Sequence, residues 1–180
     1  MNSVYALGSL TMQRAINTLG ETVMAAHTSA RRILSLAGAP MSNLGTAGAV
    51  FISQNCGAQA YDRVKQGYRA MMKIGLAYTA IAMTVMIVFR TPLIDIFSKE
   101  GGDMVLIGGQ YLVVSAIGQI FLNITYMSKS TLIGAGDSMA PVYVGLLEMA
   151  GRIIGGVVLA PFFGYLGVFA GLPIGWGLGM

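Results

Sequence analysis

Two oppositely charged side chains stand inside an apolar stretch, residues 139–160, and their spacing suggests chemistry. Glu148 and Arg152 are four residues apart, so in a helix they share one face. Charges inside a membrane are costly, which makes an intramembrane ion pair a functional hypothesis by default. The alternative is a structural pair that fixes helix packing. We slightly favour that alternative, because a pair that couples to protons must also be able to break.

A histidine is the second candidate. His27 and Arg31 are also four residues apart, and an imidazole that titrates near neutral pH could relay a proton. A histidine near a helix start is more often an interfacial residue. We favour the interfacial interpretation and keep the proton relay as the functional one.

Uncharged polar side chains are candidates to line a cavity. They are Gln13, Asn17, Gln119, Asn123 and Tyr126. The last three fall on one helical stripe, where they could face a cavity or hydrogen-bond between helices, and we favour the cavity. Arg14 lies within the first apolar segment, and in a water-filled cavity it would repel cationic substrates.

The sequence holds no residue set typical of an enzyme. It has no nucleophile–histidine–acid set, and Gly134-Ala135-Gly136 lacks the Lys and Ser/Thr of a phosphate-binding loop. The single Cys56 excludes an intramolecular disulfide and belongs to no metal-ligand cluster. A net charge of +4 without a nucleic-acid motif suits a membrane surface. We expect no enzymatic activity, no metal site, no cofactor and no nucleic-acid partner, with membrane lipids as the surroundings.

The composition indicates which elements must position these residues. Only 10% of the residues are charged, against roughly 25% in soluble domains. Charge-free gaps separate the clusters of charge, and a helix crosses the roughly 30 Å of hydrocarbon with about 20 residues. Long continuous apolar runs favour helices over a barrel. The sequence therefore predicts an all-α integral membrane protein.

We expect six membrane segments separated by Gly- and Pro-containing turns. They are about 1–19, 33–54, 70–89, 104–127, 139–160 and 165–180. Alternation places the 55–69 and 128–138 loops on one face and the 20–32, 90–103 and 161–164 connections on the other. The compact basic segment after Asn55 favours the cytoplasm for the first face. This predicts a multi-pass protein of the cytoplasmic (inner) membrane.

A polar turn ends the second segment. Gln54, Asn55, Gly57 and Ala58 lie between a charge-free run and a basic stretch. We expect the two amides to satisfy backbone groups freed at the helix end and Gly57 to permit the turn.

This turn and its neighbours resemble the multidrug and toxic compound extrusion (MATE) family of transporters. The turn is similar to a Gln-x-x-Gly-Ala type turn that follows the second helix of each half in that family. The stretches 15–28, 92–97, 134–141 and 148–167 resemble later parts of the same half in order and spacing. The resemblance covers essentially all of residues 1–180 and implies one six-helix lobe, the C-terminal helices seven to twelve of twelve, with the N-terminal lobe absent. Both ends of the sequence look cut.

The resemblance implies a secondary antiporter that exports amphipathic, often cationic compounds in exchange for H⁺ or Na⁺. In such a protein two bundles rock around a central cavity, so this chain would need the missing lobe or a second copy as its partner. A lipid or polysaccharide flippase of the same superfamily is an alternative, which Arg14, Arg31 and Arg32 keep open because lipid-linked donors carry phosphates. A non-transporting membrane bundle or an inactive truncated product is another.

Overall fold

The computed structural model describes residues 2–97 and 101–180, and side chains from residue 9 onward except residue 11. This part of the chain is helical and contains no strand, which confirms the predicted all-α class. Its elements are α1 (Asn2–Asn17), α2 (Glu21–Gly57), α3 (Tyr61–Val88), α4 (Arg90–Asp95), α5 (Asp103–Gly134), α6 (Ala140–Ile153), the π-helix η1 (Ile154–Leu159), α7 (Ala160–Phe163) and α8 (Tyr165–Leu178).

Three stretches in the described part of the chain are long and apolar enough to cross a membrane. They are α3, α5 and the continuous helical run Ala140–Phe163. The apolar helix α8 is shorter than these, and α2, although longer, is not among them. Three spans therefore follow from length and hydropathy, and the count of six stays a prediction.

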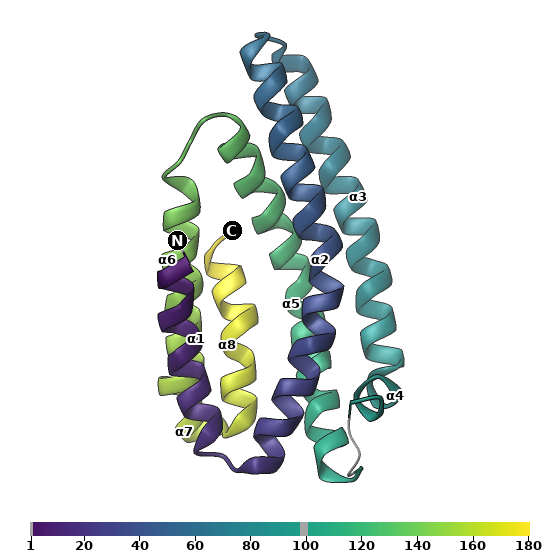
Figure 1. Cartoon of the computed structure of the whole chain (residues 1–180), viewed down its shortest axis with the longest axis vertical. Helices are drawn as coiled ribbons and strands as arrows, with labels where there is room; N and C mark the ends of the chain where they lie inside the picture. Colours follow the sequence, from purple (N-terminus) through teal and green to yellow (C-terminus); the bar gives the residue numbers. More distant parts are fainter. Residues whose placement is uncertain (1, 98–100) are drawn as a thin grey trace.

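The helices pack around α5. Figure 1 shows α2 and α3 as a long hairpin, and α5 packs against both of them and against α8. Helix α6 packs against α8, and α1 packs against α6. The α2–α3 turn and the α5–α6 loop lie at one end of the molecule, and the α1–α2 and α7–α8 connections and helix α4 lie at the other (Figure 1). The ends alternate as the sequence predicted.

Several helices extend beyond the predicted segments. Residues 21–32, expected in a connection, form the first turns of α2, and α5 continues through residues 128–134, which were expected in a loop. Charged side chains interrupt an apolar run without breaking the backbone hydrogen bonds that continue a helix. The breaks instead fall at glycines with positive φ, Gly20 (101°) and Gly136 (95°), a conformation that glycine adopts without strain.

The run from Ala140 to Phe163 is continuous but irregular. The π-helix η1 ends at Leu159, two residues before Pro161, which is the second residue of α7. Proline has no N–H to donate, and its ring crowds the carbonyl four residues earlier, here that of Val157. A widened turn relieves this crowding. The chain turns at Gly164, with φ 57°, so the break predicted for 161–164 lies at its last residue.

The apolar core and a close backbone contact between helices lie in different places. Buried core side chains come mainly from the end of α1, the first turns of α2, α5 and α8, and the end of α3 with α4. Between α6–η1 and α8, a Cβ on Gly151 or Gly155 would collide with the backbone of Gly175 or Gly171. Small residues let helices approach this closely in membranes.

Candidate functional site

A cavity of about 580 Å³ lies among α2, α5, α6 and α8. Its lining combines polar, charged and apolar side chains. The residues are Arg31, Leu34, Ser35, Gly38, Ala39, Ser42, Tyr111, Gln119, Leu122, Tyr126, Lys129, Glu148, Arg152, Leu172 and Trp176. A cavity of this size is large enough for a drug-sized molecule.

Each helix presents one face to the cavity. On α5 the lining residues after Tyr111 are Gln119, Leu122, Tyr126 and Lys129, a spacing of three, four and three that keeps one stripe of a helix together. The lining positions of α2 follow the same periodicity between residues 31 and 42. The cavity is therefore a feature of regular helix faces rather than of loops.

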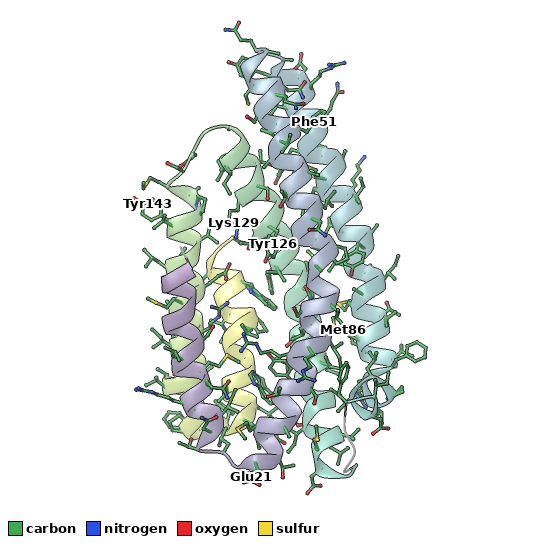
Figure 2. The ribbon with its side chains drawn as sticks, viewed as in Figure 1. Glu21, Phe51, Met86, Tyr126, Lys129 and Tyr143 are labelled. Carbon is green, nitrogen blue, oxygen red and sulfur yellow. The ribbon has the colours of Figure 1, made fainter. Side chains whose placement is uncertain are left out.

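The predicted ion pair lines this cavity. An Nη atom of Arg152 lies 3.5 Å from an Oε atom of Glu148, and the two side chains are 13% and 7% exposed. Lys129 lies close enough to Glu148 to interact electrostatically. Its Nζ is 4.8 Å from the ring centroid of Tyr126, a cation–π distance. Figure 2 labels Lys129 and Tyr126 on α5, near the upper end of α8.

The structure separates the predicted stripe on α5. Gln119, 2% exposed, and Tyr126 line the cavity. Asn123 is not among the lining residues: its Nδ2 donates to the sulfur of Met72 at 3.7 Å, and a Cβ on Gly75 would collide with its amide. At about 100° per residue, Asn123 is turned about 60° from Tyr126, far enough to face α3. Asn123 therefore lies at a contact between helices. This is the alternative that the sequence analysis weighed against the cavity and did not favour.

The candidates on α1 and His27 lie outside the main cavity. Gln13 and His27 line a second cavity of about 330 Å³ with Arg31, and Gln13 donates to the side-chain oxygen of exposed Asn17 at 3.0 Å. Buried His27 packs edge-to-face on Tyr111, with ring centroids 5.2 Å apart. Among the described residues its Nε2 has no hydrogen-bond partner.

The position of His27 differs from the favoured expectation of an interfacial residue. Its side chain is 1% exposed within the bundle. Arg14 is exposed on α1 and does not line the main cavity.

The MatE family model matches residues 1–158. The chain belongs to the MATE family. It is 30% identical over 132 residues to the "Probable multidrug resistance protein NorM" of Pasteurella multocida, which covers 73% of this chain and 28% of that protein. It is 21% identical over 171 residues to the "Probable multidrug resistance protein YoeA" of Bacillus subtilis. That match covers 93% of this chain and 37% of the Bacillus protein.

A solved structure supports the fold. A MOP-superfamily transporter from Pyrococcus furiosus matches 98% of this chain and 39% of its own, with a TM-score of 0.84 and 17% sequence identity. This MATE chain spans about a third of the length of the curated relatives that it matches.

The polar turn of this MATE chain is built differently from the expectation. The backbone N–H groups of Ala58 and Ala60 donate to the carbonyls of Gln54 and Asn55, and the Asn55 amide donates to Phe51 O at 2.8 Å. The residue with positive φ is Gln59 (57°), not Gly57. Backbone groups therefore close the helix end, and Gly57 is simply the last helical residue.

Gln54 also borders a small cavity. It lines about 310 Å³ at the α2–α5 contact, together with Ser53 and Ile133. Gly134 of α5 packs tightly there, because a Cβ on it would meet the backbone oxygen of Ala49.

Sequence reasoning missed several residues of the main cavity of this MATE chain. Lys129 was placed in a loop and Arg31 in a connection at the membrane surface, whereas both lie on helices and line the cavity. The available signal was periodicity: Lys129 follows Tyr126 by three and Leu122 by seven residues. Trp176 carried no such signal. Within the described residues, no three His, Cys, Asp or Glu side chains are grouped to hold a metal ion.

Proposed function

We propose that this MATE chain forms one lobe of a secondary antiporter that exports amphipathic compounds across the cytoplasmic membrane in exchange for H⁺ or Na⁺. The observation that carries the proposal is the 580 Å³ cavity, with its nearly buried Glu148–Arg152 pair, among helices that include two long and apolar enough to cross a membrane. Intramembrane charges in such a place mark substrate and ion pathways.

The mechanism is a shift of populations and needs no covalent step. Substrate and coupling ion stabilise different states of one protein, and each moves the equilibrium by its differential affinity. We propose His27 as the proton relay, because it lies beside the cavity residues Arg31 and Tyr111. The family resemblance implies often cationic substrates, whereas among the described lining residues three are basic and one is acidic.

A single lobe does not enclose a cavity that lies between two. The proposal therefore includes a partner bundle: the N-terminal lobe of a twelve-helix transporter or a second copy of this chain. The basic end of the α2–α3 hairpin would face the cytoplasm. A lipid or polysaccharide flippase remains the alternative, favoured by the basic lining. The other alternative, a membrane bundle that does not transport, predicts no gradient-driven flux of any compound.

Flux into proteoliposomes tests the proposal. The chain is reconstituted alone and, separately, as part of the complete product of its gene. Dansylglycine and dansyl-ethylenediamine, an anion and a cation with one fluorophore, serve as probes under an imposed H⁺ or Na⁺ gradient. The proposal predicts gradient-driven movement of at least one probe, abolished by an ionophore that dissipates the gradient. Equal movement in protein-free liposomes, for both probes and both preparations, would contradict it.

A further inference from the structure

The charges of the main cavity point to one class of substrate. Arg31, Lys129 and Arg152 line it, and Glu148 is the single carboxylate among the described lining residues. The lining thus carries two more positive than negative charges. In a site partly shielded from water such an excess sets which ligand charge is favoured.

The basic groups are distributed along the whole cavity. Tyr111 and Lys129 are eighteen residues apart on α5, which is about 27 Å at 1.5 Å per residue. Arg31 lies at the Tyr111 end of this distance, because it lines the second cavity with His27, whose ring packs on Tyr111. Arg152 lies beside Gly171 of α8. Gly171 stands between Phe169, which packs on Tyr111, and Trp176, whose carbonyl accepts from Thr125, so Arg152 lies between the ends. An anionic group therefore meets a basic side chain at either end of the cavity and at its middle.

The one carboxylate is already engaged. Glu148 lies 3.5 Å from Arg152 and interacts with Lys129. A cationic ligand that sought this carboxylate would have to separate it from a nearly buried arginine, and breaking such a pair is costly. An anionic ligand instead adds negative charge where the lining has too little.

Apolar side chains complete the lining. Leu34, Leu122, Leu172 and Trp176 belong to three of the four surrounding helices. An indole ring and leucine side chains accept an apolar or aromatic body. The cavity is therefore amphipathic, with apolar walls and a positive charge excess.

We propose that this cavity binds amphipathic anions, with the acidic group at Lys129 or Arg31 and the apolar body against Trp176 and the leucines, while Glu148 is the resting counter-ion. The proposal rests on the transport function proposed above and names the substrate class of the same site. A soluble organic anion and the head group of an anionic lipid share this chemistry.

Energy transfer from tryptophan measures the binding directly. Trp176 is the only tryptophan in the sequence and lines the cavity, so it reports a dansyl group bound there. The 180-residue chain in nanodiscs of zwitterionic lipid is titrated with dansylglycine and with dansyl-ethylenediamine. The proposal predicts that the anion binds at least about fivefold more tightly than the cation. Equal affinities, a preference for the cation, or no transfer from either probe would overturn it.

Single substitutions show which residues cause the preference for the anionic probe. Lys129→Gln should weaken dansylglycine binding by about fivefold or more, and Glu148→Gln should strengthen it by a similar factor. Lys73→Gln, exposed on α3 and outside the cavity, is the matched control and should leave it unchanged. Equal effects of Lys129→Gln and Lys73→Gln would contradict the proposal. If a variant loses its helical circular dichroism, the comparison of the two probes on the unmodified chain still decides.

A lipid competition separates the two sources of the anion. Nanodiscs in which a fifth of the lipid is phosphatidylglycerol should displace dansylglycine if an anionic head group enters the cavity, and should leave its affinity unchanged if the site takes soluble anions. Both results support the anion site and differ only in its natural occupant. Flux without charge preference in the proteoliposome assay would leave the transport function standing and remove this inference alone.

Discussion

At the scale of single residues, Glu148 and Arg152 decide how the cavity is charged. Their side chains are nearly buried and 3.5 Å apart, so removal of either partner leaves the other charge in a poorly solvated place. Such changes in buried pairs cost about 3–5 kcal/mol. Lys129 lines the same cavity and still offsets the charge of Glu148 when Arg152 is removed, so we expect a cost at the lower end of this range for the loss of Arg152.

A double-mutant cycle measures this coupling. Arg152→Gln should lower the free energy of unfolding by about 3 kcal/mol, and Glu148→Gln, which leaves two cations without a carboxylate, by about 3–5 kcal/mol. The double variant should be destabilised less than the sum of the two, by at least about 1 kcal/mol. The measurement is unfolding in mixed micelles with increasing sodium dodecyl sulfate. Additive effects would show that the two side chains do not interact.

Gln119 and Asn123 should respond differently to truncation, because they face different surroundings. Gln119→Ala removes a polar group from the cavity and should weaken binding of the dansyl probe with little change in the melting temperature. Asn123→Ala loses packing against Met72 and Gly75 and should lower the melting temperature by a few degrees without changing probe affinity. Scanning fluorimetry and tryptophan energy transfer measure the two effects. The reverse assignment of effects would contradict the placement of Asn123 toward α3.

At the scale of helices, the contact between α6 and α8 depends on glycine. A Cβ on Gly175 would lie 2.8 Å from the backbone oxygen of Glu148, whereas one on Gly177, two residues later, meets nothing within 4 Å. Backbone cannot move aside as a flexible side chain can.

Alanine at these two positions is a matched comparison on one helix. Gly175→Ala should force α6 and α8 apart and destabilise the protein by about 1–3 kcal/mol. Gly177→Ala should be neutral or slightly stabilising, because alanine favours the helix. Thermal unfolding in detergent checks both. Equal melting temperatures of the two variants would contradict the close contact.

The helices also explain what the sequence could and could not predict. Composition and gaps in charge were sufficient for the helical class, the alternation of ends and the Glu148–Arg152 pair. They did not predict the place of Lys129. A span defined by its apolar residues ends where a charged residue begins, whereas the helix α5 continues past Lys129 to Gly134. They also kept Asn123 on the cavity stripe with Gln119 and Tyr126, because a spacing of four and three does not fix which helix lies opposite each residue.

At the scale of the whole molecule, α2, α5, α6 and α8 line one side of the cavity, and the proposed transport by alternating access needs a partner bundle on the other side. The α2–α3 turn and the α5–α6 loop lie at the same end (Figure 1). A gradient that shifts the population between two states should change which side of the membrane reaches the cavity. If the cavity is the transport site, a cavity residue should therefore become more or less accessible to a reagent added from one side of the membrane.

Reactivity of a single cysteine in the cavity tests this central claim most directly. Ser42→Cys is introduced on α2 in a Cys56→Ser background, with Gln59→Cys at the exposed turn as the control. A water-soluble maleimide is added to proteoliposomes from one side. We predict that an imposed ion gradient changes the labelling rate at position 42 severalfold and that dansylglycine slows it, while position 59 is unaffected. Labelling at position 42 that is indifferent to both gradient and probe would contradict the assignment of this cavity as the transport site.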